Sequence, residues 1–140
     1  TAESARLRQK VLDDVVFHGW PAEWINAPTH MEVVGELPTD GRYRVRKLRY
    51  EVVPGFWTVA LLYEPANLQG KVPAIVNVNG HETNGKAEEY IQKRCINQAL
   101  QGMVAINPEW IFTGEMRHPH NAHWFGSHID LAGANAVGLF

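Results

Sequence analysis

Residues Asn79-Gly80-His81 are the part of the sequence whose types and spacing are best suited to chemistry. They follow the apolar run Val72 to Val78, and a helical pattern begins at Asn84. A turn between a buried strand and a helix N-terminus leaves backbone N–H groups free to hold a developing negative charge. Gly80 would give the turn conformational freedom, and the N–H of His81 would point beyond the carboxyl end of the strand. The pattern predicts an oxyanion site at Gly80 and His81, and a loop that binds nothing explains it equally well.

Two residues after a second apolar run are candidates for substrate contacts. Glu109 and Trp110 follow the strand predicted at 103–106. Trp110 could stack on a sugar ring, or it could simply pack, since a tryptophan buries a large area. Glu109 could face a substrate, hydrogen-bond the neighbouring loop backbone or pair with Arg117. Two carboxylates facing each other across a sugar would indicate a glycosidase, but sequence spacing alone does not establish that geometry.

A third candidate region is rich in histidine, and neutral imidazoles are good ligands for zinc and copper. Its spacing matches no zinc signature, and Pro119 separates two of the histidines. We therefore predict no metal or other cofactor, and expect a polar loop at the mouth of the site in which His123 and Trp124 contact the substrate. A metal site stays an alternative, with four ligand candidates: His118, His120, His123 and His128.

The elements that must position these residues begin with a helix and an irregular segment within residues 1–40. Helical spacing over 4–17 gives one apolar stripe, with Ser4 as the N-cap and Gly19 and Pro21 as the stop. The stripe consists of Leu7, Val11, Leu12, Val15 and Val16. The region 20–40 has three prolines and no sustained period, so an irregular linking segment is expected.

A change of pattern after residue 43 predicts a hairpin followed by a parallel unit. Strands at 43–53 and 56–63 flank Pro54-Gly55, which is typical of an antiparallel hairpin. A strand at 74–78, apolar on both faces, precedes a helix at 84–101 that ends at Gly102, and a strand follows at 103–106. Such a strand–helix–strand unit has parallel strands. A further helix is expected to start at 130–140.

Composition and charge exclude several classes of protein. The chain has 140 residues, 45% of them hydrophobic, and a net charge of −2, which fits one globular domain and gives no reason to expect a nucleic acid partner. No apolar run approaches the roughly 20 residues that cross a membrane. Cys95 is the only cysteine, which excludes an internal disulfide and is expected in the core. The compartment stays open between cytoplasmic, periplasmic and secreted.

The order of elements resembles the α/β-hydrolase superfamily. The hairpin, the strand ending in Asn79-Gly80-His81, the helix and the strand before Asn107-Pro108-Glu109-Trp110 are similar to its branch of acetyl xylan esterases and dienelactone hydrolases, over roughly Arg44 to Phe140. Asn79 stands where that family often has histidine. The resemblance implies an α/β fold in which residues 1–140 form a single partial domain, with 43–140 as its sheet and helix core and an incomplete three-layer sheet.

The resemblance also implies a function and its missing parts. The N–H of His81 would donate to the oxyanion of a serine esterase acting on a small-molecule ester such as an acylated carbohydrate. The superfamily needs a G-x-S-x-G elbow, whereas Ser127 is flanked at those glycine positions by Phe125 and Ile129. The nucleophile, acid and histidine are therefore expected outside this sequence, which leaves the chain inactive by itself. A non-catalytic binding protein with the same fold is the alternative, and a small metal-binding protein a weaker one.

The same resemblance predicts an unpaired sheet edge. The family's strand order places the strand ending at Asn79 beside a later strand that this sequence does not contain. Natural proteins avoid such bare apolar edges because they invite aggregation. We therefore expect the polypeptide to be ordered only with a second chain, with another copy of itself or with the remainder of a longer protein.

Overall fold

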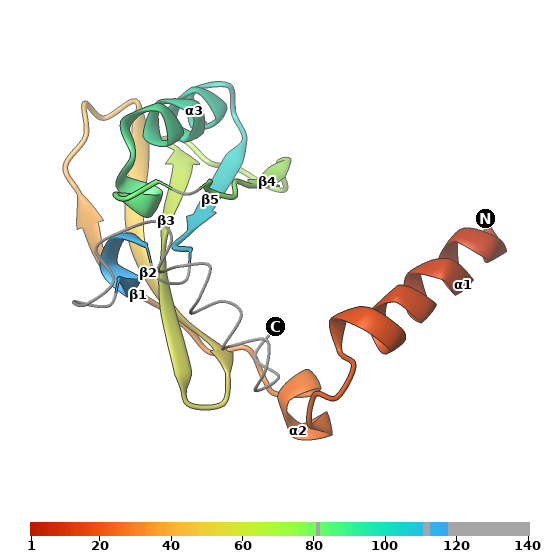
Figure 1. The fold of residues 1–140 in the computed structure, drawn as a ribbon. Helices are drawn as coiled ribbons and strands as arrows, with labels where there is room; N and C mark the ends of the chain where they lie inside the picture. Colours follow the sequence, from red (N-terminus) through yellow and green to blue (C-terminus); the bar gives the residue numbers. More distant parts are fainter. Residues whose placement is uncertain (81, 111–112, 118–140) are drawn as a thin grey trace.

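The computed structural model describes residues 1–80, 82–110 and 113–117. Its centre is a mixed sheet of five strands in the order β1-β2-β3-β5-β4 (Figure 1). The strands are β1 (Met31–Leu37), β2 (Tyr43–Val53), β3 (Phe56–Pro65), β4 (Ala74–Val76) and β5 (Val104–Pro108). The helical elements are α1 (Ala2–Val11), the π-helical turn η1 (Leu12–Val16), α2 (Ala22–Ile25), the 3₁₀ turn η2 (Gly85–Ala87), α3 (Glu89–Leu100) and the 3₁₀ turn η3 (Gly114–Met116).

The hairpin and the parallel unit are confirmed. β2 and β3 pair antiparallel around Pro54-Gly55, where Gly55 takes a φ of 85° that suits glycine. β4 and β5 pair in parallel, with α3 connecting them. Gly102 ends α3 as predicted: its φ is 85°, and the N–H of Met103 donates to the carbonyl of Gln98 at 3.0 Å, a Schellman motif. The helix itself begins later than predicted, at Glu89, because η2 occupies residues 85–87.

The core lies between α3 and one face of the sheet. Ile91, Cys95 and Ala99 recur at helical spacing on α3 and are at most 1% exposed. They pack against four buried sheet residues: Val45, Leu61, Tyr63 and Ala105. Cys95 is therefore a core residue, as predicted. Tyr90, the neighbour of Ile91 in the first turn of the helix, is half exposed.

The prediction of an irregular segment at 20–40 is wrong. Met31–Leu37 forms β1, which pairs antiparallel with β2 at the edge of the sheet. Val33 and Val34 are adjacent apolar residues, and both are more than half exposed. β1 therefore lacks the regular alternation of apolar and polar residues by which half-buried strands are detected. Backbone pairing to β2 makes this segment a strand, and that partner cannot be read from local sequence.

The strand β4 lies at the opposite edge of the sheet, and its outer side has no pairing strand among the described residues. It is shorter than the predicted 74–78, and the expected cover on both faces is not found: Val76 and Val78, which share one face, are 66% and 64% exposed, whereas Asn77 on the other face is buried. The position at the edge agrees with the strand order that the resemblance implies.

Candidate functional site

The segment that follows β4, residues 77–87, is called the β4 turn from here on. It begins at the carboxyl end of the parallel pair. The N–H of Asn77 donates to the carbonyl of Ile106 at 2.8 Å and so continues the pairing with β5. The buried Asn77 side chain donates through Nδ2 to Oε1 of Gln98 at 2.9 Å, which ties the strand end to α3. The start of the predicted oxyanion turn is therefore held by both its neighbouring strand and its following helix.

The next residues show a contact with β5 and a conformation that differs from the expected one. Nδ2 of Asn79 donates to the carbonyl of Pro108 at 3.2 Å, so the turn leans on the end of β5. Gly80 is not among the glycines with positive φ, and a Cβ there would meet no described atom within 4 Å. The conformational reason that we gave for Gly80 is therefore wrong, because this backbone is open to other residues. His81 lies outside the described residues, and its role stays a prediction.

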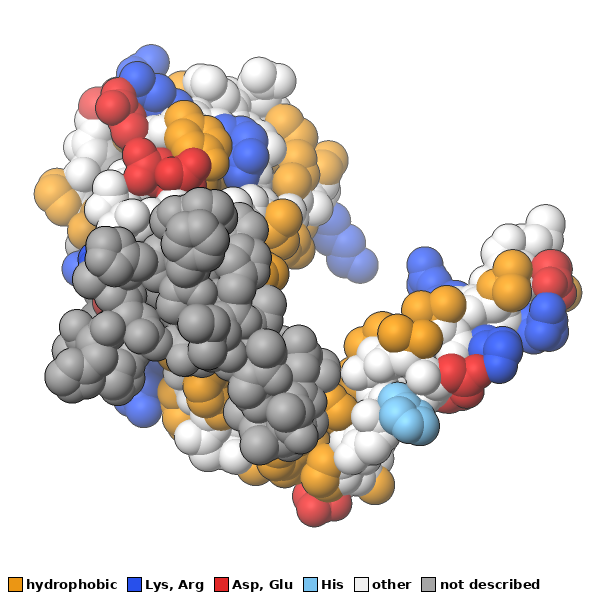
Figure 2. Space-filling view, viewed as in Figure 1, with side chains coloured by type: hydrophobic (Ala, Val, Ile, Leu, Met, Phe, Trp, Pro, Cys, Tyr) orange, Lys and Arg blue, Asp and Glu red, His pale blue; other side chains and the backbone are white. Residues whose placement is uncertain are grey.

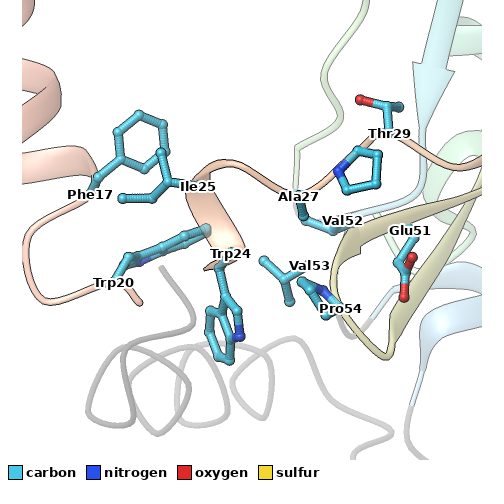
Figure 3. Close-up of a pocket in the computed structure, with 11 residues that line it drawn as sticks. Phe17, Trp20, Trp24, Ile25, Ala27, Thr29, Glu51, Val52, Val53 and Pro54 are labelled. Atoms are coloured by element: carbon cyan, nitrogen blue, oxygen red, sulfur yellow. The ribbon is translucent and has the colours of Figure 1, made fainter. Parts of the chain in front are cut away.

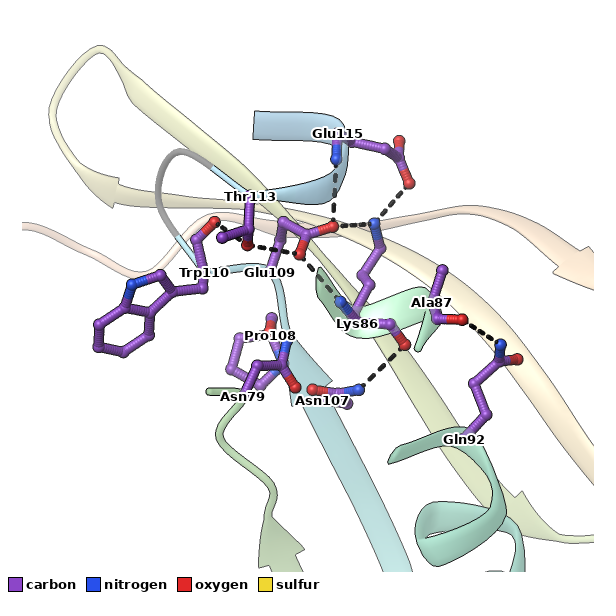
Figure 4. A network of polar contacts seen from close by, with 10 residues as sticks. All are labelled: Asn79, Lys86, Ala87, Gln92, Asn107, Pro108, Glu109, Trp110, Thr113 and Glu115. Carbon is purple, nitrogen blue, oxygen red and sulfur yellow. Dashed lines mark hydrogen bonds and ion pairs between the residues drawn. The ribbon is translucent and has the colours of Figure 1, made fainter. Parts of the chain in front are cut away.

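Glu109 is buried at the end of β5 with both carboxylate oxygens occupied (Figure 4). Its Oε1 accepts the backbone N–H of Lys86 at 3.0 Å, and its Oε2 accepts the Lys86 ammonium at 2.7 Å. The Glu115 backbone N–H lies 3.3 Å from the same Oε2. The carboxylate thus binds the neighbouring loop backbone, which is one of the roles open to it from sequence. A substrate contact by Glu109 stays a prediction.

Lys86 is a residue of the site that the sequence reasoning missed. Its side chain is 4% exposed, and its ammonium contacts Glu109 and, at 2.5 Å, the outward-facing Glu115. Burying a charge is costly unless it is paired, and removing one partner of a buried ion pair costs about 3–5 kcal/mol. The sequence held one clue to this pair: Lys86 follows the first strand of the predicted parallel unit and Glu109 follows the second, so both lie near the same end of the sheet. Asn107, fully buried beside them, donates through Nδ2 to the Lys86 carbonyl at 3.2 Å.

Trp110 lies at the same end of the sheet and is partly open to solvent. Its exposed fraction is 39%, and its carbonyl lies 2.9 Å from the Thr113 hydroxyl. The arrangement permits either of the roles predicted for it. The other candidates lie outside the described residues: His118, His120, His123, Trp124 and His128. Within the described part of the chain, no three side chains of metal-binding type come together.

Neither the serine nor the cysteine among the described residues is placed to act as a nucleophile beside this turn. Ser4 is exposed on α1, far along the chain from the sheet. Burial raises the pKa of the Cys95 thiol, which keeps the nucleophilic thiolate form scarce. Ser127 lies outside the described residues. Separately, no helix in the described ranges is long and apolar enough to cross a membrane.

A cavity of about 220 Å³ lies elsewhere, between the amino-terminal segment and the tip of the β2–β3 hairpin (Figure 3). Phe17, Trp20 and Trp24 line one side, and Val52 to Pro54 line the other. Adjacent aromatic rings meet edge to face, with centroids 5.7 and 5.9 Å apart. None of the residues of the β4 turn lines this cavity, so it is separate from the candidate site.

Comparisons of the sequence and of the structure give different results. No protein-family model matches the sequence, and no curated protein matches it significantly. The fold, however, matches a crystal structure from Bacteroides fragilis that is assigned as an acetyl xylan esterase, with a TM-score of 0.66 and 19% identity over 97% of this chain. It also matches a methylesterase, with a TM-score of 0.58 and 22% identity over 95% of this chain.

A third match is a cold-adapted esterase from an Arctic intertidal metagenomic library, with a TM-score of 0.53 and 15% identity over 76% of this chain. The chain spans 39%, 30% and 51% of the three matched chains. Together with the mixed sheet and its strand order, these matches confirm the predicted fold class, part of an α/β-hydrolase fold. At such low identity the likeness concerns the fold, and one fold hosts many functions.

Proposed function

We propose that this chain belongs to a carboxyl-ester hydrolase, in which the backbone N–H of His81 stabilises the tetrahedral oxyanion. The observation that carries the proposal is the turn at the carboxyl end of the parallel pair β4 and β5, held to β5 by Asn79. Ligands of open α/β sheets bind at this end of the strands. The fold match to three esterases supports the same reaction class.

The reaction would be acyl transfer from an ester to water. A serine would attack the ester carbonyl while a histidine takes its proton, and the carbonyl oxygen would become an oxyanion. Ser4 and Cys95 are unsuited, and Ser127 lacks the glycines of an elbow, so we place the nucleophile, its histidine and its acid outside these 140 residues. By itself the chain would supply one half of the oxyanion hole.

For the substrate we propose a small-molecule ester, with acylated carbohydrates as the class to test. Trp110 lies at the carboxyl end of the parallel pair and is 39% exposed, which suits stacking on a sugar. Two substrates test this in the complete protein. Hydrolysis of p-nitrophenyl acetate tests the reaction class, and hydrolysis of acetylated xylo-oligosaccharides tests the carbohydrate. Hydrolysis of the first without the second would leave the reaction class and remove the carbohydrate.

The decisive experiment compares two substitutions of one residue in the complete protein. His81→Pro removes the backbone N–H, and loss of an oxyanion donor costs about 10²–10³-fold in kcat. His81→Ala keeps the N–H and should keep most of the activity. Equal activity in both variants would contradict the assignment of residue 81. A wild-type protein without hydrolase activity would favour the non-catalytic binding protein.

We also propose that the outer edge of β4 is covered by further polypeptide: a second chain, a second copy or the remainder of a longer protein. Two observations support this: Val76 and Val78 are exposed, and no strand of the described residues pairs with the outer side of β4. Residues 1–140 expressed alone should self-associate or melt without cooperativity. A monomer with a sharp thermal transition would contradict this proposal.

A further inference from the structure

The Glu109 carboxylate occupies a space that two glycines create. A Cβ at Gly85 would lie 1.8 Å from Oε1, and a Cβ at Gly114 would lie 2.2 Å from Oε2. Both glycines also have positive φ, 53° and 48°, which side chains rarely adopt. The backbones of η2 and η3 therefore close on this one carboxylate from two sides (Figure 4).

The contacts of these turns bracket residue 81 along the chain. On the preceding side, Asn79 donates to the carbonyl of Pro108. On the following side, the carbonyl of Thr83 accepts the N–H of Gly114 at 3.2 Å. Three residues later, the N–H of Lys86 donates to Glu109. Both flanks of the turn are thus tied to three residues at or beyond the end of β5: Pro108, Glu109 and Gly114.

We propose that Glu109 is the positioning residue of the β4 turn, holding the backbone that carries the amide of residue 81. The inference rests on the proposed function for its catalytic consequence. The direction of a backbone N–H does not depend on a side-chain rotamer. It depends on the conformation of the backbone, which the contacts of the flanking residues hold in place. A displacement of about 1 Å in a catalytic group can cost about 10²-fold in rate.

The chemistry of Glu109 suits this role better than that of a neutral residue. Its two oxygens accept from a backbone N–H of each turn and from the Lys86 ammonium, and charge-assisted hydrogen bonds are shorter and stronger than neutral ones. The Lys86 ammonium balances the buried charge. Glutamine at this position would keep the size and lose both the charge and one acceptor, which should loosen the turn.

The test compares Glu109→Gln with Glu64→Gln in the complete protein. Glu64 is a second buried carboxylate, bound to Arg46 at 2.8 Å, and it lies near the opposite end of β5 because Tyr63 pairs with Ala105. Both substitutions remove the charge of a buried ion pair, and only Glu109→Gln touches the β4 turn. We expect Glu109→Gln to lower kcat by about tenfold or more with little change in KM, while Glu64→Gln leaves kcat unchanged at a similar loss of melting temperature.

Amide hydrogen exchange provides a readout that needs no activity. Peptides covering residues 79–87 should exchange about tenfold faster in Glu109→Gln than in the wild type, and unchanged in Glu64→Gln. Unchanged exchange in Glu109→Gln would overturn the inference whether or not the protein hydrolyses esters. Faster exchange in a protein with no hydrolase activity would keep Glu109 as the positioning residue and overturn the proposed function instead.

Thr113→Val covers the case in which Glu109→Gln does not fold. The Thr113 hydroxyl lies 3.3 Å from Oε1 of Glu109, and valine keeps the shape of the side chain. We expect faster exchange over residues 79–87 and a fall in kcat of about threefold, smaller than that of a displaced catalytic group. Wild-type values for both quantities would overturn the inference.

Discussion

The two longer helices carry the same apolar spacing and have opposite environments. In α3, residues 91, 95 and 99 recur every four positions and are buried against the sheet. In the segment formed by α1 and η1, Leu7, Val11 and Val15 recur with the same spacing and are 49%, 52% and 70% exposed. The comparison teaches that periodicity predicts a helix and its apolar face, and that only a facing element decides whether this face is buried.

The amino-terminal segment, residues 1–29, projects away from the sheet (Figures 1 and 2). Its first helix is stabilised by local interactions. The Thr1 hydroxyl caps it by accepting the N–H of Ser4 at 3.2 Å, so the N-cap predicted at Ser4 lies three residues earlier. Exposed ion pairs join Arg6 to Glu3 and Lys10 to Asp14. Isolated helices of about 15 residues are marginal in water, so this segment should be less stable than α3.

The sharpest test of the comparison replaces matched residues of the two helices. Ile91→Ala creates a cavity in the core and should lower the free energy of unfolding by about 2–5 kcal/mol. Leu7→Ala removes an exposed side chain and should change it by less than about 0.5 kcal/mol. Urea denaturation of both variants measures the difference. A large loss for Leu7→Ala would mean that the stripe on α1 is covered in solution.

Two glycines extend the comparison to the backbone. Gly85→Ala combines a left-handed φ with a clash against Glu109, and should cost about 2–4 kcal/mol. Gly19 in the amino-terminal segment has a φ of 79° and open space at its Cβ position, so Gly19→Ala pays only the conformational cost of about 1–2 kcal/mol. Thermal unfolding of the two variants checks the ranking. Equal losses of melting temperature would contradict the close packing of Gly85 against the Glu109 carboxylate.

Tyr63 allows a test by pH, because it lies in the core while its hydroxyl has no hydrogen-bond partner within the described ranges. Burial raises the pKa of the Tyr63 phenol well above its usual value. The native state therefore keeps a proton that the unfolded chain releases above pH ~10, and stability should fall by up to about 1.4 kcal/mol per pH unit there. Tyr63→Phe should keep its stability at pH 7 and lose less than the wild type between pH 10 and 11. An identical alkaline loss in both proteins would contradict a buried phenol.

The smallest expected effect concerns two exposed arginines. The guanidinium of Arg49 on β2 lies 4.4 Å from the centroid of the Trp57 ring, and an exposed cation–π contact contributes about 0.5–1 kcal/mol. Arg49→Gln should lose roughly that amount in denaturant unfolding. Arg8→Gln on the exposed surface of α1 should change stability by less than about 0.5 kcal/mol. A greater loss for Arg8→Gln would show that α1 has a partner in solution.

Sequence patterns were sufficient wherever local chemistry decides the structure. Pro54-Gly55 predicted the hairpin because glycine accepts the left-handed φ of the turn, and Gly102 predicted the end of α3 for the same reason. The run of β-forming residues from Tyr43 to Val53 became β2 over its whole length. β1 was missed because its pairing with β2, and not an alternating pattern, holds it in the sheet.

The candidate site was predicted less completely than the fold. Two features could be inferred from their positions after apolar runs: a site at the carboxyl end of β4, and Glu109 as one of its residues. The partners of Glu109 could not, because Lys86 is 23 residues away in sequence and reaches it only through the parallel pairing of β4 and β5. The conformational role expected for Gly80 belongs instead to Gly85 and Gly114, which have positive φ and where a Cβ would clash with the Glu109 carboxylate.

By itself, the sequence determined the two longer helices, the hairpin, and the strand–helix–strand order that places the β4 turn, because periodicity and turn residues are read from neighbouring positions. Only the tertiary structure decided which apolar faces are buried, that β1 joins the sheet, and that a buried Lys86–Glu109 pair joins the segment after residue 81 to the end of β5. These features depend on contacts between segments far apart in the chain, which local periodicity does not encode.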